Sequence, residues 1–189
     1  VNDFKSLVKA LGYSYNSDLT NERVLTTPSH YAFLKIAEGC NRRCSFCAIP
    51  MIRGPYHSKP VSDLVKESRF LASQGVKELI LIAQDLSYYG YDLEKKYMLP
   101  ALLDALSEVD GIEWIRLHYA YPNAFPVEVL DQMQKSSKIC HYIDIPFQHI
   151  SDRLLKQMKR GHSEKTIKNL VHTFRNKVPD IAVRTSLIV

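Results

Sequence analysis

Three of the four cysteines in this 189-residue sequence lie within eight positions of one another, in the segment AEGCNRRCSFCAIP at residues 37–50. Cys40, Cys44 and Cys47 follow the order Cys, three residues, Cys, two residues, Cys. A cysteine thiolate is the usual ligand of an iron–sulfur cluster and a common ligand of zinc. The spacing of the cysteines must therefore distinguish an iron–sulfur cluster from a zinc site. The remaining cysteine, Cys140, is predicted to be a buried small residue.

The spacing favours an iron–sulfur cluster with one open position. Structural zinc sites pair cysteines two residues apart and close with a second pair or with histidines. Plant-type ferredoxins have a longer first gap and a fourth cysteine further on. A four-iron cubane held by three thiolates keeps one iron free to bind another group, as open catalytic metal sites do. The alternatives are zinc with His57 or another histidine as the fourth ligand, and three unrelated free cysteines.

The neighbours of the cysteines suit a bulky anionic group. Phe46 would help to exclude water, and Arg42 and Arg43, with the backbone amides of the loop, would offset negative charge. Gly39 and Pro50 suit a loop that folds tightly around such a group. We therefore expect this segment to enclose its ligand closely.

The composition fits one globular domain, or a large part of one, in the cytoplasm. Apolar residues make up 46% of the chain, and 25 basic against 20 acidic side chains give a net charge of +5. This mild excess suits an anionic partner such as RNA or a ribosome surface, but also an ordinary mixed-charge surface. The sequence has no membrane-span run and no secretory signal. Thiols stay reduced in the cytoplasm, so clustered cysteines are expected to serve a metal or a reaction.

Strand-like and helix-like patterns alternate from residue 31 onward, whereas residues 1–30 are expected to be a linker arriving from something upstream. Each predicted strand except the last is followed by a helix. The strand-like segments are residues 31–37, 79–83, 114–119, 142–147 and 181–189. The helix-like segments are residues 61–75, 99–109, 126–133, 151–158 and 163–178.

Several positions predict where these elements begin, end and pack. Ser62 is a candidate N-cap, Gly75 a C-terminal stop, and Pro100 suits the first turn of its helix. The run LILIA at residues 79–83 is apolar on both faces, which is typical of a parallel strand covered by helices. We therefore expect a buried parallel sheet with helices outside it.

Repeated strand–helix–strand units predict either an open doubly wound sheet or a barrel, and no phosphate-binding glycine fingerprint follows the first strand. In both architectures functional groups gather at the carboxyl ends of the strands. The cysteine loop and three further polar or aromatic segments come directly after strands: Gln84 and Asp85, residues 119–122, and Gln148 with His149. One rim of the sheet is therefore expected to hold these groups.

The CxxxCxxC pattern, with an aromatic residue before its last cysteine, resembles that of the radical S-adenosylmethionine (radical SAM) enzymes. The resemblance implies a partial (β/α) barrel and a [4Fe–4S] cluster on Cys40, Cys44 and Cys47. It also implies that the open iron chelates S-adenosylmethionine. In that family an electron passed through the cluster cleaves the cofactor and releases a radical that abstracts hydrogen from an unactivated carbon.

The likeness extends over about residues 24–189 and points to the methylthiotransferases. RVLTTPSHYAFLKIAEGCNRRCSFCAIPMIRG and LILIAQDLSYYG are similar to the entry and second strand of their radical domain. LHYAYP at 117–122 and the segment at 142–161 resemble the group that modifies an aspartate of ribosomal protein S12 (RimO-like). The alternative is the group that modifies an adenosine of transfer RNA (MiaB-like), which typically has Ser-His-Pro at 120–122 and Gln-Ser-Gly-Ser at 148–151.

The resemblance also implies roles for polar residues at the rim. Gln84 and Asp85 occupy the place where the superfamily usually holds the amino group of the cofactor, although they could instead cap the next turn. Gln148 and Arg184 are candidates to touch its ribose or carboxylate, and Arg184 could equally be a surface group.

The remaining candidates concern the substrate side of the rim. His149 could position substrate or be structural, and Tyr119 and Tyr121 could line the substrate cavity or belong to the core. Ser151 with Asp152 is most simply the start of a helix.

The resemblance further implies partners and parts beyond this sequence. The partners are ribosomal protein S12 or the small ribosomal subunit, and an electron donor such as flavodoxin or ferredoxin. A second [4Fe–4S] cluster is expected in a separate N-terminal domain whose three cysteines this sequence lacks. We therefore expect residues 31–189 to be a radical SAM core domain, truncated at its C-terminal end and lacking full turnover alone. A non-catalytic iron–sulfur or zinc module is the alternative from another class.

Overall fold

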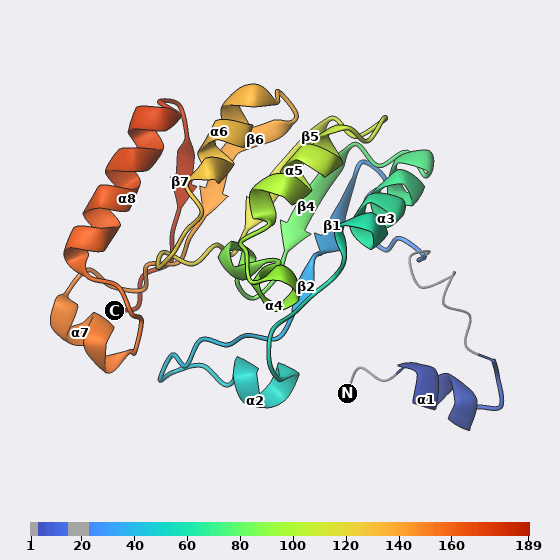
Figure 1. The fold of residues 1–189 in the computed structure, drawn as a ribbon, viewed down its shortest axis with the longest axis horizontal. Coiled ribbons are helices and arrows are strands. Elements are labelled where there is room, and N and C mark those ends of the chain that lie inside the picture. The colour runs from blue at the N-terminus through green and yellow to red at the C-terminus, as the bar shows by residue number, and fades with distance from the viewer. Residues whose placement is uncertain (1–3, 15–22) are drawn as a thin grey trace.

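The computed structural model describes residues 4–14 and 23–189 and is built around a parallel sheet in the order β1-β4-β5-β6-β7 (Figure 1). Each strand is added beside the one before it in the chain. A doubly wound sheet reverses its order at a switch point, whereas a barrel adds strands in one direction. The order therefore favours the partial barrel. The strands are β1 Tyr31–Lys35, β4 Glu78–Ile82, β5 Trp114–His118, β6 Ile139–Asp144 and β7 Ala182–Arg184.

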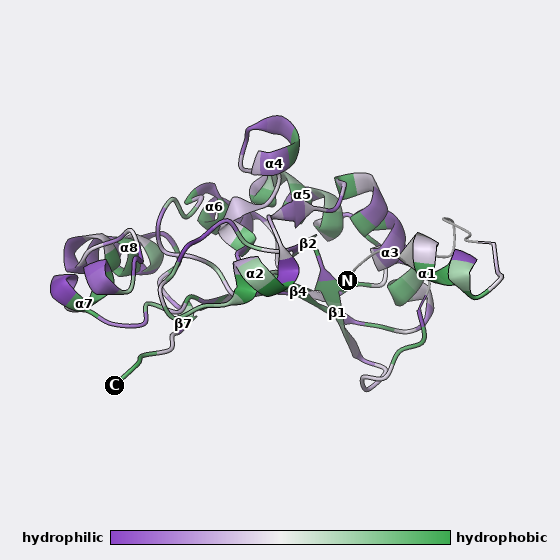
Figure 2. Cartoon of the chain, turned by 90° about the horizontal axis from the view of Figure 1, so that it is seen from below, coloured by the Kyte–Doolittle hydropathy of each residue, from purple (hydrophilic) through white to green (hydrophobic). Residues whose placement is uncertain are grey.

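The connecting helices cover one face of this sheet, because right-handed crossovers that always advance in one direction return on the same side. Figure 2 shows α3, α5 and α6 together on that side. The larger helices are α3 Val61–Ser73, α5 Leu99–Ser107, α6 Glu128–Lys135 and α8 Glu164–Lys177, and the short α7 is Asp152–Gln157.

The core lies between the sheet and these helices. Alternate strand residues such as Leu34, Leu79, Leu81 and Leu117 are almost completely buried there. Their strand neighbours face the inside of the partial barrel, and Ile80 and Ile82 are only half-buried. The helices therefore cover the outer face of β4, as expected for a parallel sheet with helices outside it, because a barrel strand has helices on its outer face only.

The ends of α3 show how local chemistry sets the boundaries. Pro60, not Ser62, occupies the N-cap position, and Ser62 lies inside the first turn. Gly75 has φ +90° and follows the helix as predicted, where its amide donates to the carbonyl of Ala72 at 2.9 Å. The predictions that Pro100 lies in the first turn of its helix and that Ser151 starts the next short helix are confirmed, since α5 begins at Leu99 and Ser151 is the N-cap of α7, whereas α6 begins at Glu128, two residues after the predicted start.

Small elements that the sequence patterns did not predict surround the cysteine segment. β2 Ala37–Glu38 and β3 His57–Ser58 form a two-stranded antiparallel pair, which closes the base of the loop between them. The loop contains α2 Ile49–Arg53. The 3-10 helix η2 Leu86–Tyr88 and α4 Tyr91–Glu94 follow β4.

The N-terminal segment is described only in part. Residues 4–10 form α1 Phe4–Ala10, and Leu25 packs against the core. Residues 1–3 and 15–22 of the predicted linker lie outside the described residues. No helix in the described parts of the chain is long and apolar enough to cross a membrane.

Candidate functional site

A cavity of about 300 Å³ lies at the carboxyl ends of the strands. This is the rim where the sequence predicts the functional groups, and all three clustered cysteines line it. The loop after β2 contributes Cys40, Arg42, Cys44, Phe46, Cys47 and Ile49. The segments after β4, β5, β6 and α7 contribute Ala83, Gln84, Tyr119, Ala120, Tyr121, Pro146, Gln148 and Arg160.

Backbone hydrogen bonds hold the cysteine loop in shape, both within the loop and to the end of α7. The amide of Cys40 donates to the carbonyl of Gly54 at 3.2 Å, and the amide of Ser45 donates to the carbonyl of Met158 at 3.0 Å. Gly39 has φ +77°, and a Cβ placed there would lie 2.1 Å from the carbonyl oxygen of Pro55. Only glycine fits this conformation and this approach, so the residue before the first cysteine determines where the loop turns.

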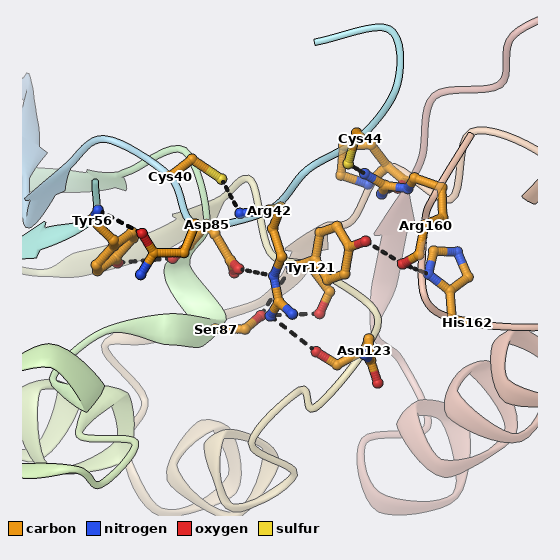
Figure 3. Close-up of polar contacts among 12 residues, drawn as sticks. Cys40, Arg42, Cys44, Tyr56, Asp85, Ser87, Tyr121, Asn123, Arg160 and His162 are labelled. Atoms are coloured by element: carbon orange, nitrogen blue, oxygen red, sulfur yellow. Dashed lines mark hydrogen bonds and ion pairs between the residues drawn. The ribbon is translucent and has the colours of Figure 1, made fainter. Parts of the chain in front are cut away.

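Two of the sulfur atoms have hydrogen-bond donors beside them (Figure 3). The backbone amide of Arg42 donates to Sγ of Cys40 at 3.4 Å, and Nη1 of Arg160 donates to Sγ of Cys44 at 3.4 Å. Burial raises the pKa of the Cys40 thiol, while the Arg42 amide acts in the opposite direction. Donors aimed at sulfur stabilise a thiolate, which is the form that binds a metal.

The arrangement fits a cluster better than a single metal ion. In the described residues, no three histidine, cysteine, aspartate or glutamate side chains converge closely enough to hold one ion. The zinc candidate His57 is exposed and does not line the cavity. A cubane places its thiolates on different iron atoms, so the three sulfurs need only surround a common space. The cavity provides that space.

Asp85 lies behind the cavity wall and is 1% exposed. Its Oδ2 accepts a hydrogen bond from Nε of Arg42 at 2.9 Å, and its backbone carbonyl accepts one from the hydroxyl of Tyr56 at 2.8 Å. Burial raises the pKa of Asp85, and the Arg42 guanidinium partly offsets this. Asp85 thus holds Arg42 in the wall, an arrangement that the sequence did not predict.

Gln84 and Gln148 line the cavity as predicted. Nε2 of Gln84 donates to Oε1 of Glu38 at 3.4 Å, while its Oε1 is buried without a hydrogen-bond partner. Gln148 has φ +72°, and its backbone bonds to the last segment of the chain, with its amide donating to Ser186 at 2.9 Å. A left-handed backbone at a non-glycine residue is uncommon and often marks a functional position.

Arg184 lies apart from the cavity, since its Nη1 donates to Oδ2 of Asp144 at 3.3 Å and its side chain is 58% exposed. His149 accepts a hydrogen bond from the amide of Ser151 at 2.8 Å and does not line the cavity either. The predicted contact between Arg184 and the cofactor remains a prediction. Tyr119 and Tyr121 both line the cavity, with Tyr121 largely buried.

Sequence reasoning missed Arg160, which is 6% exposed. It lies in the basic stretch at residues 156–168, whose composition favours a solvated surface. Figure 3 shows Tyr121 between Arg42 and Arg160, and their Cζ atoms lie 4.1 and 4.3 Å from the centre of its ring. No local pattern in the sequence distinguishes Arg160 from its exposed basic neighbours.

Comparison with known sequences identifies the family of this chain and several relatives. A profile of the radical SAM superfamily matches residues 34–189. Ribosomal protein uS12 methylthiotransferase RimO of Flavobacterium johnsoniae is 59% identical over 187 residues, and that of Cytophaga hutchinsonii is 54% identical over 188. These alignments cover 99% and 100% of this chain but only 43% of each relative. The chain therefore spans less than half the length of these relatives.

Solved structures support the architecture independently. The radical S-adenosylmethionine methyltransferase TsrM of Kitasatospora setae has a TM-score of 0.65 and 19% sequence identity, over 83% of this chain and 30% of that one. The cobalamin-dependent S-adenosylmethionine radical enzyme OxsB has a TM-score of 0.63 and 16% identity, over 82% and 23%. At such low identity the likeness concerns the fold, and it confirms the radical SAM type of partial barrel.

Proposed function

Because this chain belongs to the radical SAM superfamily, we propose that its cavity binds a [4Fe–4S] cluster through Cys40, Cys44 and Cys47, with S-adenosylmethionine at the fourth iron. We propose further that residues 31–189 are the core domain of an enzyme that adds a methylthio group to the β-carbon of an aspartate of ribosomal protein uS12. The substrate part of the proposal is supported by the identity to RimO proteins over nearly the whole chain.

One observation carries the cofactor part: the three cysteines of a single short loop line the same cavity at the carboxyl ends of the strands. The only other cysteine of the sequence, Cys140, lies in β6, one residue from its start and so at the other end of that strand. Three protein ligands around one space leave a coordination position for a small molecule. When bound, the cluster supplies the electron that cleaves S-adenosylmethionine.

The cavity wall supplies groups that suit the polar end of that cofactor. The unpaired Oε1 of Gln84 can accept a hydrogen bond from an ammonium group, and Gln148 brings a second amide to the same cavity. Asp85 acts through Arg42, which it orients, because it is too deeply buried to reach a ligand itself. Arg184 would need to leave Asp144 before it could contact the cofactor.

Apolar and aromatic side chains form much of the cavity wall and would limit the access of water to the reacting groups, although Phe46 itself is 49% exposed. Ile49, Ala83, Ala120 and Tyr121 form part of the wall, and Phe46 lies between the second and third cysteines. A dry cavity strengthens hydrogen bonds to the cofactor and protects a reactive intermediate from solvent hydrogen donors.

Anaerobic reconstitution tests the cofactor assignment. We expect about four irons and four sulfides per chain, and a change in the electron paramagnetic resonance spectrum of the reduced protein when S-adenosylmethionine is added. A triple Cys40, Cys44 and Cys47 to Ala variant should bind neither iron nor sulfide, whereas Cys140→Ala should load like the wild type. A protein that binds zinc without sulfide would contradict the assignment.

A deletion strain complemented with the full-length gene tests the substrate. Mass spectrometry should find the methylthio group on the aspartate of ribosomal protein uS12 and leave the adenosine of transfer RNA unchanged. The reverse result would favour the transfer-RNA reaction. Neither modification, with a spectrum unaffected by S-adenosylmethionine, would favour a non-catalytic iron–sulfur module.

The proposed substrate implies the setting in which the protein works. We expect a cytoplasmic enzyme that meets uS12 alone or on the small ribosomal subunit, with flavodoxin or ferredoxin as electron donor. Complete turnover is expected to need the further parts of the longer relatives, including the second cluster of an N-terminal domain.

A further inference from the structure

Arg160 is a buried cation without a carboxylate partner. It is 6% exposed, and no aspartate or glutamate in the described parts of the chain forms an ion pair with it. Its Nη2 donates to the carbonyl of Pro146 at 2.6 Å, its Nη1 to Sγ of Cys44 at 3.4 Å, and its Nε is buried without a partner. A buried charge is strongly unfavourable unless an opposite charge compensates it.

Arg42 provides the comparison, because it lines the same cavity but has its own counter-ion. Its Nε bonds to the carboxylate of Asp85 at 2.9 Å. That pair is neutral overall, so it adds little net charge to the cavity. Arg160 leaves a full positive charge there, beside Sγ of Cys44, which would be a thiolate once it binds the proposed cluster.

Tyr121 holds Arg160 in position through two contacts, one with its guanidinium group and one with its backbone. The ring lies against the guanidinium, with 4.3 Å between its centre and Cζ, and the Tyr121 hydroxyl donates to the backbone carbonyl of Arg160. The backbone of Tyr121 is held in turn by Ser87, whose Oγ accepts from its amide at 2.9 Å. An arginine braced in this way loses little entropy when it bonds to an anion.

We propose that Arg160 is a positioning residue for the cluster, which donates a hydrogen bond to the Cys44 thiolate and raises the reduction potential of the cluster. This inference rests on the proposed cluster site. Reduction adds negative charge, so a fixed cation and a hydrogen bond to a ligand sulfur stabilise the reduced state more than the oxidised state. The cation that the fold leaves unpaired thus makes the cluster easier to reduce.

The test is a redox titration of the reconstituted chain without S-adenosylmethionine, followed by absorbance and electron paramagnetic resonance. Arg160→Met removes both the charge and the donor and should shift the potential to a more negative value. Arg160→Lys keeps the charge and should recover most of the wild-type potential. Arg153→Met is the matched control, because it removes the same charge from an exposed position of α7 and should leave the potential unchanged.

A second variant covers the case in which Arg160→Met does not fold. Tyr121→Phe keeps the ring but removes the hydroxyl that braces Arg160, so it should shift the potential in the same direction by a smaller amount. Thermal unfolding of each apo-protein separates folding from redox effects. A lower melting temperature with a wild-type potential in both variants would show that Arg160 is only structural and overturn the proposal.

Two further outcomes have distinct meanings. If Arg160→Met keeps the wild-type potential but loses affinity for S-adenosylmethionine in equilibrium binding, Arg160 serves the cofactor and the proposal is wrong. If the wild-type chain itself assembles no cluster, the proposed function fails first. Iron and sulfide analysis of the wild type, made before any titration, distinguishes these two failures.

Discussion

The helix-covered core and the cavity wall differ in how many of their buried polar atoms lack a hydrogen-bond partner. The helix-covered core beside Leu79, Leu81 and Leu117 is almost entirely apolar. Among the described residues, buried polar atoms without a hydrogen-bond partner include Gln84 Oε1 and Arg160 Nε in the cavity wall and Asp85 Oδ1 behind it, while two more are on Ser107 of α5 and on His162. Because such groups are unfavourable for folding alone, the three that lie at or behind the wall beside the cysteines indicate a wall shaped for a ligand. The core stabilises the fold, whereas the wall contains polar groups that destabilise the unliganded fold and can bind a ligand.

The largest expected effect separates stability from cluster binding. Leu81→Ala should lower the free energy of unfolding by about 4 kcal/mol, because it removes a fully buried side chain and leaves a void. The iron content of the folded fraction should remain at the wild-type level. Denaturant unfolding and iron analysis measure both. Ile82→Ala, on the half-buried face of the same strand, is the control and should cost about 1 kcal/mol; equal losses would contradict the comparison.

Asp85→Asn tests the buried ion pair between Asp85 and Arg42 beside the cavity. It should lower the free energy of unfolding by about 3 kcal/mol, since it leaves Arg42 without its counter-ion in a largely buried place. Adding Arg42→Met should restore part of the loss, which a double-mutant cycle measures. Glu113→Gln breaks an exposed pair with Lys77 and should change stability by no more than about 0.5 kcal/mol. Independent, additive effects of Asp85 and Arg42 would argue against the ion pair.

Gly39→Ala addresses the turn that positions the first cysteine. The added methyl group meets the carbonyl oxygen of Pro55 and the residue keeps a positive φ, so we expect a loss of about 2 kcal/mol and weaker cluster loading. Gly54 is the matched control in the same loop, because it also has a positive φ but open space around its Cβ position. Because Gly54 has φ +75° and ψ −165°, a region that is essentially restricted to glycine, Gly54→Ala should cost about 2 kcal/mol through backbone strain alone but keep cluster loading at the wild-type level. Full loading of Gly39→Ala would show that the loop adapts freely.

The smallest effect concerns an ion pair far from the cavity, between β6 and the segment before β7. Nδ1 of His141 lies 2.8 Å from Oδ1 of Asp180, and this hydrogen bond raises the pKa of His141 above 6.5 and lowers that of Asp180 below 3.8. The contribution of His141 is complete below pH 6.5 and is lost as the pH rises through its raised pKa. That of Asp180 is lost as the pH falls through its lowered pKa.

Melting temperatures from about pH 5 to about pH 9 test this pair. The difference between the wild type and His141→Gln should be largest at the acidic end of that range and shrink towards the alkaline end. His172→Gln is the control, because His172 is exposed on α8 and contacts Asn176 rather than a carboxylate. A difference that does not change with pH would mean that His141 contributes only through neutral contacts.

The sequence predicted the elements whose signal is local or periodic. Strand residues such as Leu79 and Leu81 are buried as their apolar run implies, and α8 begins after Ser163, whose side chain accepts from the amide of Thr166. Short elements such as α2 and the pair of β2 with β3 escaped prediction. A pair of two-residue strands has almost no pattern of its own, and its register is set by contacts that form only in the folded loop.

The sequence by itself determined the ligand chemistry, because three thiolates at fixed spacing belong to one short segment, and it determined that polar residues follow the strands. Only the tertiary structure decided what those residues do. Asp85 and Arg42 are separated by 43 residues, and Arg160 and Cys44 by 116. Charges so distant in the chain acquire their partners when the strands align, and burial then decides whether each charge needs a counter-ion. For this reason only the folded structure shows that Asp85 pairs with Arg42 and that Arg160 is the cation beside the cysteine loop.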